Sequence, residues 1–237
     1  MQRIRRGFTL IEVSIFLAIT GLLFAMVVIG VQNSISQQRF NDVVQNYVEF
    51  LRSIYAGVTN VQSSGTGNTE RAIYGKMVTF GESGSQGKMM VYDVTGDANG
   101  DLSSGNLADS LAGLNAKIEP SGETYTLRWG AKLENVGSND EYKGALMIIR
   151  HPRSGIVYTV SKNSVLNSKG PFNRDYWSKF DFGAVNYCID PDNDISNRRR
   201  VDVKIANNAR NSSGIEIVAD NGNPDDPDGG NPCRGAN

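Results

Sequence analysis

The chain has 237 residues, a formal net charge of −1, one histidine and two cysteines. A zinc site built from cysteine and histidine needs about four ligands, so this composition excludes one. The nearly neutral charge provides no global basic field that would direct the chain toward nucleic acid. The 26 glycines exceed the usual share and favour a body rich in turns and β-strands over a helical bundle.

The N-terminus combines a short basic leader with a long apolar segment. Residues 1–7 carry three arginines, and residues 13–31 are almost wholly apolar. A helix of about 19 residues spans roughly 28 Å, enough to cross the hydrocarbon core of a membrane. Because the arginines precede the apolar segment, we expect the N-terminus in the cytoplasm and the body outside. A cleaved secretory signal fits less well, since no small-residue cleavage site follows the segment.

A single acidic residue, Glu12, lies at the start of this apolar segment. A plain membrane anchor does not require it, although the helix dipole favours an acid in the first turn. The string Gly7-Phe8-Thr9-Leu10-Ile11-Glu12, after a basic leader and before an apolar helix, resembles the class III signal of type IV pilins and type II secretion pseudopilins. The strong part of this resemblance covers residues 1 to about 60.

The resemblance implies processing and assembly at the N-terminus. A prepilin peptidase is expected to cut between Gly7 and Phe8 and to methylate the new amine of Phe8. Glu12 is then expected to face the N-terminal amine of a neighbouring subunit in a filament. A carboxylate beside an ammonium is compensated in an apolar core and fixes the register between subunits. Many pilins also carry a mid-helix proline that melts a short segment, but here no proline precedes Pro120.

Helical periodicity continues beyond the apolar segment. Apolar residues between Phe40 and Val58 recur at i, i+3, i+4 and i+7, which is typical of one helix face. We therefore expect one helix over Phe8–Val61; two helices joined near Gln32–Ser36 are the alternative. Its first half would enter the membrane or a filament core, and its second half would pack against a sheet.

The rest of the chain alternates between short apolar runs and clusters of Gly, Ser, Asn and Asp. These runs predict strands at Ala72–Phe80, Lys88–Val94, Thr124–Leu133, Ala145–His151, Ile156–Val160, Ala184–Ile189, Val201–Ile205 and Ile215–Val218, and Leu107–Leu114 predicts a short helix. The predicted fold is α+β and pilin-like: a long N-terminal helix packed on an antiparallel sheet. The predicted domains are a leader at 1–7, a helix at 8–61 with residues 8–31 in the membrane or filament core, and a β-rich body outside the cytoplasm at 62–237.

The two cysteines lie in the expected exported body. Disulfides persist outside the cytoplasm, so Cys188 and Cys233 are expected to pair, with two free thiols as the alternative. Such a bond would attach the acidic tail to a strand, and it resembles the C-terminal disulfide loop of many pilins.

Two weaker patterns concern ligands. Asp97, Asn99 and Asp101 alternate as in calcium loops, but a solvated turn is favoured because the glycine and glutamate of an EF-hand are missing. The region of Arg198, Arg199, Arg200 and Arg210 resembles the C-terminal end of FimT/GspH-type minor pilins, some of which bind DNA. Nearby acids oppose a polyanion, so a salt-bridged surface turn is favoured.

No catalytic constellation accompanies these patterns. His151 lies before Pro152 without a nucleophile motif, and the aromatic residues of 176–180 are expected to pack locally. We therefore expect a structural protein without a cofactor, calcium being the one candidate metal, with DNA or a surface ligand as a less favoured partner. The function expected is a minor pilin or pseudopilin in the bacterial membrane and then in a pilus or pseudopilus. Its partners would be other pilin subunits, the prepilin peptidase, the inner-membrane assembly platform and, before assembly, membrane lipid. An adhesin or DNA-binding minor pilin is the alternative, followed by an anchored periplasmic protein that never polymerises.

Overall fold

The computed structural model describes residues 9–59, 62–63, 71–81, 87–97, 106–136, 140–151, 154–162, 164, 172–181, 184–190, 200–206, 209–219 and 233. The chain divides into two compact units, Met1–Asp42 and Val43–Asn237. The predicted leader boundary lies outside the described residues. The division of the chain into leader, helix and body therefore stays a prediction.

A long helix, α1, runs from Leu10 to Thr59. It contains residues of both compact units, and neither Gly21 nor Gly30 interrupts it. The sequence prediction of one helix is confirmed in place of two helices joined near Gln32–Ser36. At its C-terminal end, Nη1 of Arg150 donates a hydrogen bond of 2.6 Å to the carbonyl oxygen of Thr59. A cation at this position complements the negative end of the helix dipole, since the last turn of α1 has no basic residue.

The strands form two antiparallel sheets within the described part of the chain. The first sheet contains β1 (Gln62–Ser63), β2 (Arg71–Phe80), β3 (Lys88–Asp97), β4 (Lys117–Thr126), β6 (Gly144–Arg150) and β7 (Val157–Lys162) in the order β4-β3-β2-β6-β7, with β1 paired to β2. The second contains β5 (Lys132–Glu134), β8 (Val185–Asp190), β9 (Val201–Ile205) and β10 (Ile215–Ala219) in the order β10-β9-β8-β5. The fold is α+β as expected, but the expectation of one sheet is wrong, because alternation within a strand does not specify which strand lies beside it.

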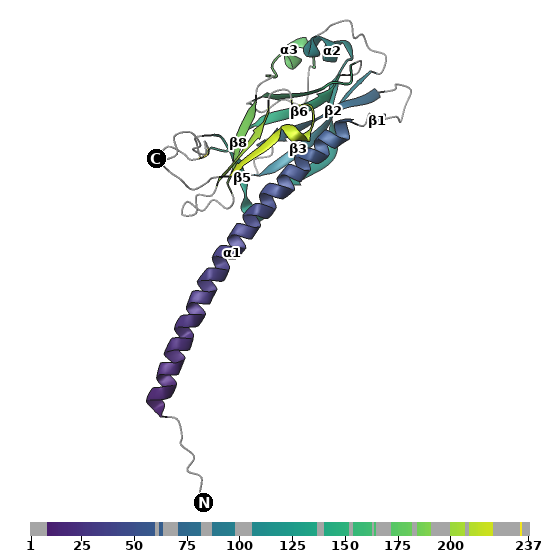
Figure 1. Ribbon diagram of the computed structural model, residues 1–237. Helices are drawn as coiled ribbons and strands as arrows, with labels where there is room; N and C mark the ends of the chain where they lie inside the picture. The colour runs from purple at the N-terminus through teal and green to yellow at the C-terminus, as the bar shows by residue number, and fades with distance from the viewer. Residues whose placement is uncertain are drawn as a thin grey trace, which may run out of the picture. The chain divides into compact units, whose positions relative to one another are not determined.

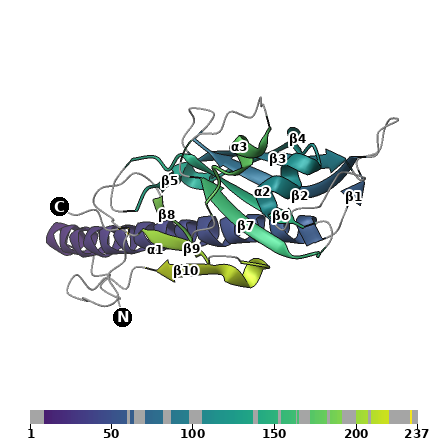
Figure 2. The ribbon, with the colours of Figure 1, turned by 90° about the horizontal axis from the view of Figure 1, so that it is seen from above.

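The second half of α1 packs against both sheets of its unit. Its buried residues share one face of the helix: Val43, Val44, Tyr47, Val48, Leu51, Ile54, Tyr55 and Val58. The hydroxyl of Tyr55 lies 2.8 Å from Oγ1 of Thr159 on β7, while Tyr47 contacts Tyr187 on β8. Figure 2 shows β6 and β7 on one side of this part of α1 and β10 on the other. The predicted amphipathic stripe is therefore the element that joins the two sheets.

Two short helices cover the opposite face of the first sheet. They are α2 (Leu107–Gly113) and α3 (Arg174–Trp177), which lie together in Figure 1. Leu111 of α2 and Trp177 of α3 share a buried cluster with Met77 and Met147 of the sheet. The side chains of Asp109 and Arg174 form an ion pair between the two helices. The helix predicted at Leu107–Leu114 is confirmed, and α3 was not predicted.

One predicted strand, Thr124–Leu133, is wrong. The chain leaves β4 at Thr126, forms a short 3₁₀ turn at Arg128–Gly130, and enters β5 in the other sheet. The turn is sharp because Trp129 and Gly130 both adopt the left-handed region, with φ of 61° and 78°. The other seven predicted strands overlap β2, β3, β6, β7, β8, β9 and β10.

Candidate assembly site

The N-terminus of α1 is closed by a reciprocal pair of hydrogen bonds between Thr9 and Glu12. The backbone N–H of Glu12 donates to Oγ1 of Thr9 over 3.3 Å, and the backbone N–H of Thr9 donates to Oε2 of Glu12, also over 3.3 Å. The hydroxyl of Thr9 donates to the same carboxylate oxygen over 3.4 Å. This is a capping box, which satisfies two backbone donors and places a negative charge at the positive end of the helix. Glu12 therefore has a role within its own helix.

The segment Leu10–Val28 of α1 is long and apolar enough to cross a membrane, with a mean hydropathy of 2.4. None of this segment is buried within the chain. Its hydroxyl groups need no external partner: Ser14 donates to the carbonyl of Ile11 over 2.9 Å, and Thr20 donates to that of Phe16. An exposed apolar surface of this kind is consistent with a membrane anchor.

Several predicted site residues lie outside the described ranges: Gly7, Phe8, Asn99, Asp101, Arg198 and Arg199. Asp97 is described, and one of its carboxylate oxygens accepts a hydrogen bond of 3.1 Å from Nδ2 of Asn115. Among the described residues, no group of three or more His, Cys, Asp and Glu side chains is placed to hold a metal ion. Calcium at Asp97, Asn99 and Asp101 thus stays a prediction.

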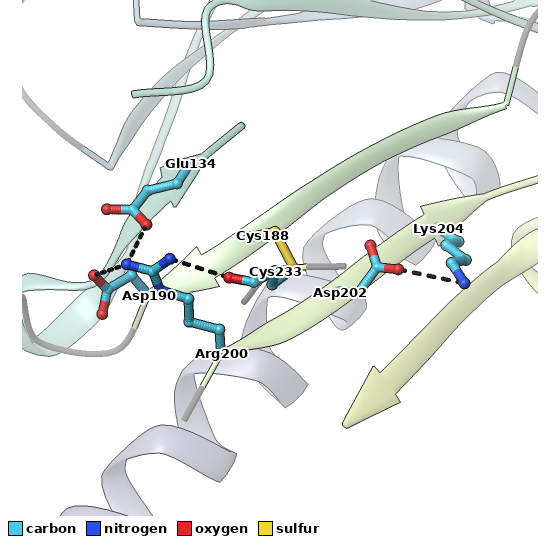
Figure 3. Close-up of a disulfide and its surroundings, with 7 residues drawn as sticks. All are labelled: Glu134, Cys188, Asp190, Arg200, Asp202, Lys204 and Cys233. Carbon is cyan, nitrogen blue, oxygen red and sulfur yellow. Dashed lines mark hydrogen bonds and ion pairs between the residues drawn. A yellow bond between two sulfur atoms is a disulfide. The ribbon is translucent and has the colours of Figure 1, made fainter. Parts of the chain in front are cut away.

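Cys188 of β8 and Cys233 form a disulfide, with 45 residues of sequence separation. Both cysteines are buried. The bond fixes Cys233 beside the second sheet, next to the charged side chains drawn in Figure 3. A covalent link of this kind restricts the unfolded chain and so stabilises the fold.

Arg200 is held by acceptors from three parts of the chain (Figure 3). Its Nη2 lies 3.2 Å from Oε2 of Glu134 and 3.9 Å from Oδ2 of Asp190, while Nη1 donates to the carbonyl oxygen of Cys233 over 3.0 Å. The Arg200 side chain is 17% exposed, so little of it is left for a phosphate group. Arg210, by contrast, is exposed.

Glu134 is the member of this cluster that sequence reasoning missed. Its side chain is only 2% exposed, and burial raises the pKa of its carboxyl. The nearby Asp190 raises this pKa further, whereas Arg200 and Lys132 oppose the shift. Its sequence neighbours are ordinary for a short strand, so only the tertiary structure reveals that Glu134 meets the largely buried Arg200.

Asp202 lies on β9, beside Cys188 and on the same face of the sheet. Its side chain is completely buried, and neither carboxylate oxygen has a hydrogen-bond partner among the residues that the structure describes. Nζ of Lys204 lies 3.4 Å from Oδ2 and forms an ion pair with it. Burial raises the pKa of Asp202, and Lys204 counters that effect.

The remaining candidate residues have structural contacts. Trp177 and Phe180 are buried in the cluster under α3, which confirms local packing of the aromatic run. Nδ1 of His151 accepts a hydrogen bond of 3.2 Å from the backbone N–H of Ser154.

The comparisons with known proteins concern the N-terminus. Residues 2–28 match the family model described as the prokaryotic N-terminal methylation motif. No curated protein and no solved structure matches the chain. The motif marks pilin-type structural proteins, which are not enzymes. The α+β architecture is consistent with a pilin-like fold. The chain thus begins with the class III signal of type IV pilins and pseudopilins.

Proposed function

We propose that this chain is a minor pilin or pseudopilin, a subunit of a type IV pilus or of a type II secretion pseudopilus. The observation that carries the proposal is the segment Leu10–Val28, which lies within the methylation motif and exposes its apolar side chains. Lipid covers these side chains before assembly, and the corresponding helices of other subunits cover them in the filament. Both environments remove apolar surface from water.

Processing exposes the N-terminal amine of Phe8, whose positive charge compensates the carboxylate of Glu12 in a neighbouring subunit. A prepilin peptidase cuts between Gly7 and Phe8 on the cytoplasmic side and methylates the amine of Phe8. Glu12 pairs with the N-terminal amine of a neighbouring subunit, because an unpaired carboxylate among apolar helices is costly and an ion pair offsets that cost. The inner-membrane assembly platform moves the subunit from lipid into the filament.

The first experiment is N-terminal sequencing and intact-mass measurement of the protein from membranes, with and without a co-expressed prepilin peptidase. We expect a peptidase-dependent start at Phe8, with the additional mass of a methyl group. A chain that keeps Met1 in the presence of the peptidase, or one that is cut beyond Val31, would contradict the proposal.

A second experiment separates the two roles of Glu12. Glu12→Gln keeps the capping box, since glutamine serves at the same position, but removes the charge. Thr9→Ala removes the capping hydroxyl and keeps the charge. Filament incorporation, measured in sheared or cross-linked fractions, should fall strongly for Glu12→Gln and little for Thr9→Ala. If Thr9→Ala lowers incorporation strongly and Glu12→Gln does not, Glu12 acts through the capping box of its own helix and not through its charge between subunits.

A further inference from the structure

Cys188, one half of the disulfide, lies between two acidic residues in the second sheet. In the strand register, Cys188 of β8 lies opposite Glu134 on β5 and opposite Asp202 on β9. Residues that lie opposite one another in antiparallel strands point to the same face, with their Cβ atoms about 5 Å apart. All three side chains are buried. Cys188 is therefore flanked by a buried carboxyl group on each side.

The charged groups around Cys188 are already paired with one another. Within the described part of the chain they comprise three acids, Glu134, Asp190 and Asp202, and three bases, Lys132, Arg200 and Lys204. Each base lies between 3.2 and 3.9 Å from a carboxylate oxygen, so the bases compensate the carboxylates. A thiolate at Cys188 would add a further negative charge at a side chain that water does not reach. Burial and the two neighbouring carboxyl groups therefore disfavour the thiolate of Cys188.

Cys233, the other half of the disulfide, has different surroundings. It lies in a turn, and its carbonyl oxygen accepts a hydrogen bond of 3.0 Å from Nη1 of Arg200 (Figure 3). A cation beside a cysteine favours its thiolate. Cys188, by contrast, is fixed within β8 by strand pairing on both sides. Cys233 is therefore the cysteine that more readily carries a negative charge and that a local opening exposes first.

We propose that this disulfide closes through Cys233 and that the carboxyl groups beside Cys188 then keep it from opening. The thiolate of Cys233 attacks a small disulfide oxidant, forms a mixed disulfide and releases one thiolate of the oxidant. Cys188 loses its proton, attacks the sulfur of Cys233 and releases the second thiolate of the oxidant. The two cysteines lose two electrons and two protons, and the oxidant takes up the two electrons. This inference does not depend on filament assembly.

Opening of the bond by a thiol reductant meets an obstacle at either sulfur. Attack on the sulfur of Cys233 expels the thiolate of Cys188 between two carboxyl groups, which makes Cys188 a poor leaving group. Attack on the sulfur of Cys188 requires access to a side chain that is completely buried within the sheet. Closure avoids the second obstacle, because Cys188 reacts only with the sulfur of Cys233, which is already beside it. The folded body therefore keeps the bond closed against thiols in its surroundings.

The order of reaction is tested with two single-cysteine variants of the full chain in detergent micelles. Cys188→Ser leaves Cys233 as the only thiol, and Cys233→Ser leaves Cys188. Oxidised glutathione at pH 7.5 should form the mixed disulfide at least about tenfold faster with Cys233 than with Cys188, measured by intact mass. Both variants lack the bond, so each is the control of the other for its loss, and circular dichroism checks that they fold. Equal rates, or a faster reaction of Cys188, would overturn the proposal.

A second test keeps both cysteines and the closed bond. Asp202→Asn removes a charge beside Cys188 at nearly constant shape and should raise the rate of opening by dithiothreitol at least about threefold at pH 7.5. The matched control is Glu216→Gln, because Glu216 lies one strand further away on β10, opposite Lys204, and is exposed. That variant should open at the parent rate. Thermal unfolding of both variants separates this effect from stability, since Asp202→Asn should open faster without a lower midpoint.

Two results of the second test would contradict the proposed role of the carboxyl groups. One is an unchanged or lower rate of opening for Asp202→Asn. The other is an equal rise for Glu216→Gln, which would show that any loss of negative charge on this face of the sheet has the same effect.

Discussion

The hydroxyl oxygens of Tyr47 and Tyr187 lie 2.5 Å apart in the interior of the body. Tyr47 lies on α1 and Tyr187 on β8, 140 residues later, and both side chains are completely buried. Their rings meet edge to face, with centroids 6.0 Å apart. A buried hydroxyl is costly without a partner, so each tyrosine makes the other acceptable in the core. The contact fixes the position of α1 on the second sheet.

A double-mutant cycle tests this mutual dependence. Tyr47→Phe or Tyr187→Phe alone leaves one buried hydroxyl without its partner and should lower the free energy of unfolding by about 1–3 kcal/mol. The double variant should lose clearly less than the sum, because neither hydroxyl then remains. The free energy of unfolding is measured by denaturant in detergent for the parent chain, the two single variants and the double variant. Tyr125→Phe is a control at a half-buried tyrosine. Additive losses would contradict the coupling.

Three buried tyrosines, Tyr47, Tyr142 and Tyr187, should make the stability of the fold sensitive to alkaline pH. Burial raises the pKa of Tyr142 to about 12, and it raises the pKa of Tyr47 and of Tyr187 well above the ordinary value of 10.0. Above about pH 10 the unfolded chain loses protons that the folded chain keeps, so stability should fall as pH rises. Phenolate absorbance from these residues should appear together with the loss of circular dichroism. Phenolate absorbance complete before unfolding would show that these hydroxyls reach water.

Most of strand β4 was missed by the sequence analysis, and its residues explain why. Most residues of β4 are exposed, and Pro120 and Gly122 lie inside it, so Lys117–Thr126 has neither the alternation nor the composition of an ordinary strand. It is an edge strand of the first sheet, where a proline is tolerated. The predicted strand Thr124–Leu133 instead followed the apolar residues across the turn at Trp129. The paired strands β8 and β9 alternate clearly and were predicted within a residue of their observed bounds.

The charged residues of the second sheet show a second limit of sequence-based prediction, which is the identification of partners far apart in the chain. The sequence favoured a salt-bridged turn for the arginines, and Arg200 does form ion pairs with Glu134 and Asp190. The partner Glu134 lies 66 positions earlier, and the two residues meet because β5, β8 and β9 belong to one sheet. The N-terminal signal, by contrast, is contiguous in sequence, so the motif match at residues 2–28 tests it without any tertiary structure.

Removal of the disulfide should destabilise the body. The bond between Cys188 and Cys233 spans 45 residues, and the chain-entropy model gives about 4 kcal/mol for a loop of this length. The double variant Cys188→Ser/Cys233→Ser should therefore unfold at clearly lower denaturant concentration. Arg200→Met should cost less in that background than in the parent protein, because Cys233 no longer supplies a fixed carbonyl. An equal cost in both backgrounds would show that the disulfide and Arg200 act independently.

Asp202 should be a site where removal of a charge stabilises the protein. Its buried carboxylate has no hydrogen-bond partner within the described residues, and burial raises its pKa. The folded chain therefore takes up a proton at higher pH than the unfolded chain, and the charged form lowers stability at neutral pH. Asp202→Asn should raise the midpoint of thermal unfolding at pH 7.5, and the gain should shrink as pH falls through the raised pKa. Glu134 is the matched comparison: burial and the nearby Asp190 raise the pKa of its carboxyl as well, so Glu134→Gln should also raise the midpoint at pH 7.5. A lower midpoint for Asp202→Asn at pH 7.5 would mean that the ion pair with Lys204 outweighs the cost of burying the carboxylate.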